Sequence, residues 1–461
     1  MTQSKRKLLL FNQVLAGWDK NGPAVILNAR AEPFMQPIRR TSFAKLTQKD
    51  VSAAIARHEM LYSGRLGGAR AVFAFCDLSG LDLSGRNLAD ADFTGAVLEE
   101  ANLSGTRLDS ASFFAADLRR ANLAGASLRR ADIRGASLRG ANLIGADLYE
   151  ADLREGTIAE KDKHGNLRIM QHDVGPSDMP GAMLNSANLE RAKMSGAVAS
   201  QADFTDAIMK NCRLVRANLR QAILTGANLE NADLSSCDLS GANLSGAVLI
   251  GTLFTNAQTQ GTDMTGTLSD EACGRDPSEL AIPVDEMLAS HTRWVETDGR
   301  EGAPADLNNV DLRKAGLLTH RVLTALIAPG ANFYGMNLEG ASLQGSNLQG
   351  ADLRSVKLIG ADLRGVNLSR AKLNYADLRD CKLGPLMISD SRLLPARLDG
   401  AIARYADFRG ADLRRVNLTG TELAYANLYD VDLRGANIDA ADVSGAKLPP
   451  DLVPAAAASV A

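Results

Sequence analysis

The segment from residue 159 to residue 181, AEKDKHGNLRIMQHDVGPSDMPG, contains the residue types of a metal site. Imidazole nitrogens and carboxylate oxygens are common ligands of divalent metals. Its glycines and prolines, and the alternating stretch LRIM, are typical of a hairpin or loop instead. We therefore expect an excursion from the main fold rather than a metal centre. Loops on rigid scaffolds often carry function, so two histidines remain candidate partner contacts: His164 and His172.

Other reactive residues do not form a recognisable catalytic arrangement. The five cysteines contain no C-x-x-C pair, so neither a zinc cluster nor a redox dithiol is indicated. His58 and His291 have no partner ligands at a metal-binding spacing. The sequence also has no glycine-rich phosphate loop, G-x-S-x-G elbow or H-E-x-x-H motif. We assign no catalytic residue, metal ligand or cofactor, and expect that the protein is not an enzyme.

The elements that position all these residues follow a five-residue repeat. Large apolar residues recur every fifth position in three runs: Phe73 to Ile158, Leu184 to Met264, and Phe333 to Leu448. A small residue, usually Ala, stands two positions before most of them, and Gly often stands two positions after. Side chains two residues apart on a strand share a face, and Gly tolerates a sharp corner. The repeat predicts short strands joined by corners into coils that stack about 4.8 Å apart.

The string ADLRRANLAGASLRRADIRGASLRGANLIGADLYEADL resembles the pentapeptide-repeat family, whose motif is A-(D/N)-L-x-x. The resemblance covers roughly 70% of the chain. It implies an all-β solenoid, a right-handed quadrilateral β-helix with four repeats per coil. Four cysteines take the small inward position and are expected to be buried structural thiols: Cys76, Cys212, Cys237 and Cys381.

Stacked coils leave open edges that proteins usually cover, and two stretches read as short capping helices. Both carry an aliphatic-Ala-x-His sequence followed by Gly-Arg-x-Gly. His58 and His291 occupy matching places, and each ring is expected to pack on the first coil and hydrogen-bond to its backbone. Thr47 and Asp50 form a capping-box pattern at the start of the first helix.

These signals divide the chain into eight expected segments. They are an N-terminal cap or small subdomain (1–46), a capping helix (47–64), solenoid run 1 (65–158), a loop or hairpin insertion (159–181), run 2 (182–268), a helical linker or cap (269–303), run 3 (304–448) and a flexible tail (449–461). The sequence leaves open whether the runs form one continuous solenoid or two, and what residues 1–46 do.

Composition narrows the classes of partner. The chain has 461 residues with 51 basic and 54 acidic side chains, so it lacks the basic excess of a nucleic-acid binder. Aromatic residues are only 5%, as a narrow coil requires. No apolar run has the length of a membrane span, and the N-terminus lacks the features of a signal peptide. We expect a cytoplasmic protein without a transmembrane segment.

Outward positions suggest a binding face. If every coil has twenty residues, three arginines share one column: Arg354, Arg414 and Arg434. Tyr405 and Tyr425 share another column, and aromatic side chains are enriched at interfaces. These five residues, with His164 and His172, form the candidate interaction surface.

We expect a non-enzymatic scaffold that binds a protein partner, with a homodimer left open. The resemblance implies two alternatives, a DNA-mimicking protein that binds gyrase or another topoisomerase, and a secreted effector. Mimicry needs a strongly acidic face, whereas run 3 has 16 acidic and 18 basic residues.

Overall fold

The computed structural model describes most of the chain. The described residues are 43–156, 159–161, 167–169, 176–316 and 318–449. The chain divides into two units, residues 1–45 and 46–461, and everything below concerns the second unit except strand β1 (Ala44–Lys45). Most of the expected N-terminal subdomain (1–46) and tail (449–461) lies outside the described residues.

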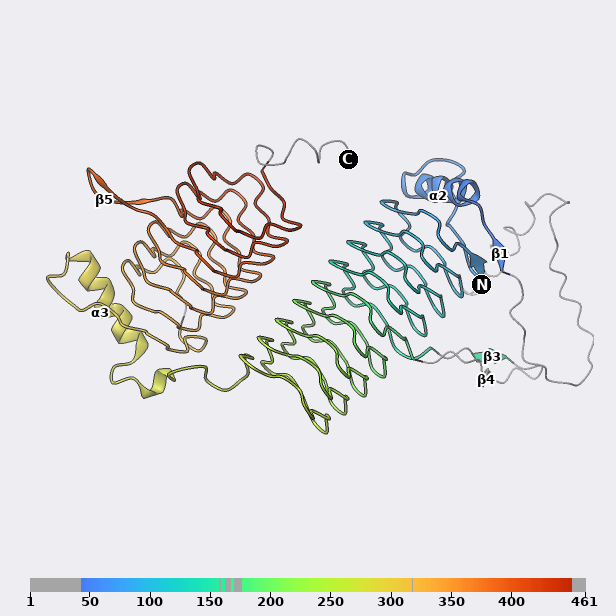
Figure 1. Ribbon diagram of the computed structural model, residues 1–461, viewed down its shortest axis with the longest axis horizontal. Coiled ribbons are helices and arrows are strands. Elements are labelled where there is room, and N and C mark those ends of the chain that lie inside the picture. Colours follow the sequence, from blue (N-terminus) through green and yellow to red (C-terminus); the bar gives the residue numbers. More distant parts are fainter. Residues whose placement is uncertain (1–42, 157–158, 162–166, 170–175, 317, 450–461) are drawn as a thin grey trace, which may run out of the picture. The chain divides into compact units, whose positions relative to one another are not determined.

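The repeats form right-handed quadrilateral β-helices, drawn as stacked coils in Figure 1. Parallel bridges join each outward residue to the one twenty positions later, as in Asp82 with Asn102 and Asn102 with Asn122. Four five-residue repeats therefore complete one coil. The small and large inward residues, such as Ala101 and Leu103, are fully buried. The predicted division of each repeat into inward and corner positions is confirmed.

The repeat from Ala101 to Gly105 shows how the backbone N–H and C=O groups find hydrogen-bond partners. The N–H groups of Leu103 and Gly105 donate to the next coil, that of Asn102 donates to the previous coil, and that of Ala101 donates within its own. The N–H of Ser104 donates to the side chain of Asn102 at 3.2 Å. Four carbonyls accept backbone N–H groups, but the carbonyl of Gly105 receives none from the described backbone. Each repeat therefore leaves one free acceptor, at its corner.

Runs 1 and 2 form one continuous stack. The bridge from Ser137 to Asp178 spans 41 positions instead of twenty, so 21 residues leave the coil and the stack then resumes in register. The insertion contains the antiparallel strands β3 (Ala159–Lys161) and β4 (Leu167–Ile169). The short strand β2 (Cys76–Asp77) lies near the start of this stack. We call residues 71–268 the first solenoid.

Run 3 forms a second stack with its own core. Its first bridge joins Arg275 to Val310, and its buried residues form a cluster distinct from that of the first solenoid. We call residues 305–448 the second solenoid. The question that the sequence left open is therefore answered: the described runs form two solenoids.

A helix precedes each solenoid (Figure 1). Helix α2 (Gln48–Tyr62) begins with the predicted capping box of Thr47 and Asp50, which is confirmed. The 3₁₀ turn η2 (Pro277–Glu279) and helix α3 (Val284–Glu296) lead into the second solenoid.

Both helices carry the predicted histidine contact. The Nδ1 of His58 accepts the N–H of Ala71 at 3.0 Å, and the Nδ1 of His291 accepts that of Ala305 at 3.1 Å. Both rings are fully buried. The expectation that each ring packs on the first coil is confirmed.

A projecting hairpin interrupts the second solenoid. It consists of strands β5 (Leu386–Ser389) and β6 (Arg392–Leu394), which pair antiparallel. The bridge from Asn367 to Arg397 spans thirty positions, so ten residues leave the coil. The apolar side chains of Ile388 and Leu393 keep the five-residue frame but are 52% and 42% exposed. Their assignment as inward positions was wrong.

The hairpin also overturns the predicted arginine column. Ten residues equal two repeats, or half a coil, so every residue after the hairpin lies half a coil away from the wall that counting in twenties assigns to it. Bridges place Asp352 in line with Lys372 and Ile402, whereas Asp362 is in line with Lys382, Asp412 and Asp432. Arg354 therefore does not share a column with Arg414 and Arg434.

Candidate functional site

The first solenoid carries an apolar strip on one outward face. Val248 and Leu268 take the outward position that Asp, Asn or Ser usually fills, and each is only 2% exposed. They pack with Tyr334 of the second solenoid, with Ile250 beside them. These contacts begin the seam, our name for the contact between the two solenoids.

Tyr334 anchors the seam with its hydroxyl group. The hydroxyl donates to Glu230 at 2.9 Å and accepts from the side-chain amide of Asn228 at 3.0 Å. Glu230 also forms an ion pair with Lys210 at 2.8 Å. Burial and the negative charge of Glu230 raise the pKa of Tyr334 above its ordinary value. The phenol therefore remains a neutral donor at physiological pH.

Further polar contacts extend the seam. In these contacts, the later residue of the second solenoid meets the earlier residue of the first. Arg354 donates to the carbonyl of Gly246 at 2.5 Å and pairs with its own neighbour Asp352. The hydroxyl of Tyr375 donates to the backbone carbonyl of Asp206. Polar interfaces between domains of one chain resemble transient protein contacts, so the seam has the chemistry of a docking surface.

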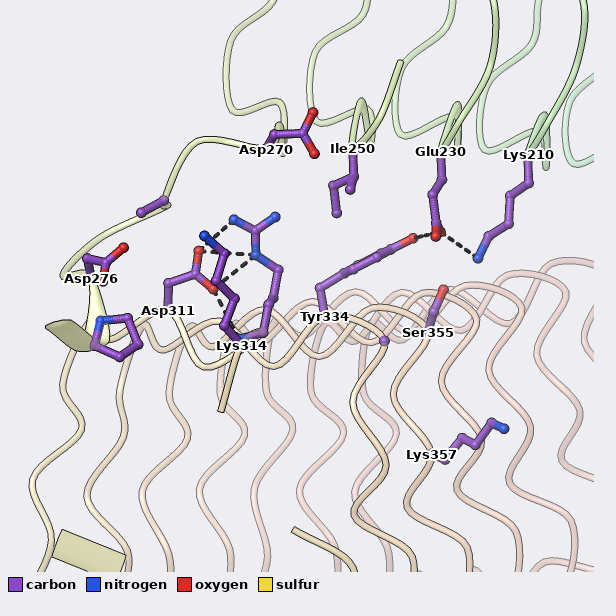
Figure 2. Close-up of a pocket in the computed structure, with 14 residues that line it drawn as sticks. Lys210, Glu230, Ile250, Asp270, Asp276, Asp311, Lys314, Tyr334, Ser355 and Lys357 are labelled. Atoms are coloured by element: carbon purple, nitrogen blue, oxygen red, sulfur yellow. Dashed lines mark hydrogen bonds and ion pairs between the residues drawn. The ribbon is translucent and has the colours of Figure 1, made fainter. Parts of the chain in front are cut away.

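A cavity of about 520 Å³ lies beside Tyr334, and Figure 2 shows its lining. Both signs of charge line it, including the pairs Lys210–Glu230 and Arg313–Asp311. Burial acts to raise the pKa of Asp311, but its bonds to Arg313 and to the N–H of Cys273 bring that pKa below the ordinary value. The carboxylate is therefore held ionised as half of a structural pair. The lining has no histidine or cysteine, and its two ion pairs occupy four of its eight charged side chains.

Three tyrosines stack along one corner of the second solenoid, and we call them the tyrosine ladder: Tyr375, Tyr405 and Tyr425. Successive ring centroids are 5.1 Å apart, with interplanar angles of 11° and 4°. Tyr334 lies on the same corner two coils before Tyr375, so four of the chain's seven tyrosines are here. Each ladder residue has a φ near +60°, a conformation that costs a non-glycine residue about 1 kcal/mol or more. Stacking along the corner offsets that cost.

The structure places the other predicted site residues apart from one another. Arg354 lies in the seam, whereas Arg414 and Arg434 are exposed and pair with Asp412 and Asp432. His164 and His172 lie outside the described residues. Tyr405 and Tyr425 share one column, as predicted, and their rings stack.

Sequence reasoning missed Tyr334, Tyr375 and Asp206. One signal was available for the seam, because Val248 and Leu268 are apolar at outward positions one coil apart. Tyr375 was hidden by the hairpin, since it stands thirty positions before Tyr405 rather than twenty.

Three of the five cysteines are buried inside the coils. Burial raises the pKa of the Cys212 and Cys381 thiols, and that of Cys237 to about 12. The prediction of buried thiols is confirmed for these three, whereas Cys76 is only partly buried. Within the described part of the chain, no group of three or more His, Cys, Asp or Glu residues could hold a metal ion. No described helix combines the length and apolar character needed to cross a membrane.

Comparison with known proteins agrees with the repeat geometry. A family described as pentapeptide repeats matches more than half of the chain, at residues 76–113, 116–154, 182–221, 212–249, 232–268, 322–354, 346–384, 392–423 and 411–448. No curated protein matches.

Several solved structures are similar. HetL from the cyanobacterium Nostoc is 22% identical, with 87% of this chain and 98% of that chain covered and a TM-score of 0.15. Rfr23 from the cyanobacterium Cyanothece is 28% identical, with 30% and 88% covered and a TM-score of 0.20. QnrB1, a plasmid-mediated fluoroquinolone resistance protein, is 18% identical, with 44% and 92% covered and a TM-score of 0.27. The arrangement of the two solenoids therefore rests on this chain's own contacts.

Proposed function

The chain belongs to the pentapeptide-repeat family, and from this premise we propose that it is a non-enzymatic scaffold that binds a protein partner. A solenoid with nearly all its backbone groups paired is a rigid support, and its outward side chains are available for contact. Rigid scaffolds that position projecting loops are a common arrangement for binding.

The hairpin β5–β6 is the observation that carries this proposal. Its inner side is fixed to the solenoid wall, because Leu386 and Leu394 lie against Gly365, where an added Cβ would be 2.9 Å and 3.1 Å from them. Its cross-strand pair of Met387 and Leu393 is 66% and 42% exposed. With Ile388, these side chains form an apolar projection on a polar surface. Exposed apolar patches of this kind mark protein contact sites.

The test is affinity capture with the full-length chain, using the variant Met387→Ser with Leu393→Ser. A partner that depends on the hairpin should lose about a hundredfold in affinity, because burial of these two apolar side chains contributes about 3 kcal/mol and each 1.4 kcal/mol is tenfold. The matched control is Leu253→Ser, since Leu253 is 54% exposed on the first solenoid. If every purified partner bound the hairpin variant as tightly as the wild type, the hairpin would not be the contact surface.

Gyrase mimicry is a less favoured function for this chain. Along the second solenoid, many carboxylates are neutralised by an arginine two positions later, as in Asp377 with Arg379 at 2.7 Å and Asp407 with Arg409 at 2.7 Å. A surface of internally paired charges is a weak imitation of DNA phosphates. Inhibition of gyrase supercoiling by the purified chain would favour this alternative over the scaffold. Cytoplasmic location, the absence of nucleic-acid binding and the secreted-effector alternative remain predictions from the sequence.

A further inference from the structure

One corner of the first solenoid presents a row of free backbone acceptors. The bridges that join Asp82, Asn102, Asn122 and their successors align these corners. We call the corner carbonyls the carbonyl row: Gly85, Gly105, Gly125, Gly145, Ser186, Asp206, Gly226 and Gly246. No backbone N–H of the described residues donates to any of them.

The seam already uses two members of this row. Arg354 donates to the carbonyl of Gly246, and the hydroxyl of Tyr375 donates to that of Asp206. Both donors lie on the corner that carries the tyrosine ladder. A complementary pair of surfaces is therefore established within the chain, with donors on the second solenoid and acceptors on the first.

Both surfaces continue beyond the seam. Tyr405 and Tyr425 extend the donor corner, and Tyr425 is 43% exposed. Their hydroxyls have no hydrogen-bond partner among the described residues. The acceptor row continues through Gly85, Gly105, Gly125 and Gly145, where an added Cβ would meet no atom within 4 Å. No neighbouring side chain shields these positions.

Only the hydroxyl-bearing edges of Tyr405 and Tyr425 are free to contact a partner. Tyr405 stacks on Tyr425, whose far face lies on Gly445, where an added Cβ would be 2.6 Å from the ring. The ring faces are therefore occupied, which excludes stacking of a nucleic-acid base on them without separating the rings. Phenol hydroxyls at the ring edges select hydrogen-bond acceptors.

The spacing of the ladder identifies what it fits. Its rings repeat every 5.1 Å, close to the roughly 4.8 Å between neighbouring strands of a sheet. Same-side carbonyls along a single extended strand repeat at about 6.6–6.8 Å, which is a poor match. The ladder is therefore complementary to stacked corners, such as those of a solenoid, rather than to one extended peptide.

We propose that Tyr405 and Tyr425 bind the free Gly85–Gly145 part of the carbonyl row in a second copy of this chain. The contact repeats between molecules the pairing that Tyr375 and Asp206 make within one. It goes beyond the scaffold function and does not depend on it, because the purified chain alone is sufficient to test it.

The test is sedimentation velocity of the full-length protein over a wide range of concentrations. Wild type should self-associate, and Tyr405→Phe with Tyr425→Phe should weaken that association about tenfold, since two hydrogen bonds are lost while both rings are kept. The matched control is Tyr429→Phe, because Tyr429 is 59% exposed and lies outside the ladder. Its self-association should equal that of the wild type.

A second pair of variants tests the acceptor side. The double variant Gly105→Asn with Gly125→Asn places two side chains over the carbonyl row. Asn is chosen because it tolerates the left-handed backbone conformation of the corner. The double variant should weaken self-association, whereas Gly80→Asn, at an equally open corner of another column, should not. A chain that stays monomeric at all concentrations overturns the proposal. So does self-association that is insensitive to both the ladder and the glycine variants.

Discussion

The carboxylate of Asp206 in the first solenoid lies 2.8 Å from the guanidinium of Arg404 in the second, although 198 positions separate them in sequence. The side chain of Asp206 is only 5% exposed. Arg404 also pairs with Glu422 at 2.7 Å, so one guanidinium bridges two carboxylates. The polar contacts of the seam depend on this bridge, because removal of Arg404 leaves the buried carboxylate of Asp206 without its charged partner.

Arg404→Ala should therefore destabilise the docked seam by about 1–3 kcal/mol, less than for a fully buried pair because Arg404 is partly exposed. Hydrogen exchange at residues 203–210 and 372–376 measures this loss. Arg414→Ala is the matched control, since its pair with Asp412 is exposed, and it should change exchange in the seam by less than about 0.5 kcal/mol. Equal protection in both variants would show that the bridge does not hold the seam.

The seam should weaken as pH rises. Burial raises the pKa of Asp206 above its ordinary value, against the opposing effect of Arg404. A raised folded-state pKa favours the docked form while the carboxyl is protonated, and this contribution is lost as pH rises through the folded value. The unfolding free energy of wild type minus that of Asp206→Asn should thus fall from about pH 3.5 to pH 7. A difference that stays flat or increases would contradict this reasoning.

The cap helices should respond to pH in the opposite direction. Burial lowers the pKa of His58, whose Nδ1 must stay unprotonated to accept the N–H of Ala71. Its contribution is present above about pH 6.5 and lost as pH falls through the folded value. The melting temperature of wild type should therefore drop relative to His58→Asn between about pH 7 and pH 5. His320→Asn, at an exposed corner, should show no such difference.

Core damage should remain local. Phe93 stacks between Phe73 and Phe113, with centroids 5.2 Å and 4.8 Å away. Phe93→Ala should cost about 3–5 kcal/mol through the cavity that it leaves. Coils of a solenoid contact mainly their neighbours, so faster hydrogen exchange should be confined to the first coils. Leu253→Ala, an exposed counterpart, should cost less than about 0.5 kcal/mol, and accelerated exchange in the second solenoid would contradict nearest-neighbour stability.

The coil could be predicted from the sequence because the packing of each repeat depends on residues within that repeat. The Ala–Leu pair, the corner glycine and the cap histidines are local patterns, and the structure confirms each. The seam depends instead on pairs such as Asp206 and Arg404, which no local pattern connects. Outward apolar residues gave only a weak indication, because single exposed apolar residues are normal on protein surfaces.

The hairpin was missed for a different reason. Ile388 and Leu393 match the five-residue frame, so periodicity alone could not distinguish them from inward residues. Pro385 and Pro395 flank the hairpin, but a proline shows only that regular pairing stops and not how many residues leave the coil. Because the length of the break could not be predicted, Arg354 was placed in the same column as Arg414 and Arg434, which lie on another wall.

The ten-residue hairpin separates two ways of counting along the chain. Inward and outward positions repeat every five residues, whereas the wall on which a residue stands repeats every twenty residues of the coil itself. Residues that leave the coil change the number of every later residue but not its place in the stack. An excursion of this kind can therefore be gained or lost while the core and the surface columns stay intact. Tyr375 and Tyr405 stand in one line although thirty positions separate them, because ten of those positions lie in the hairpin and outside the coil.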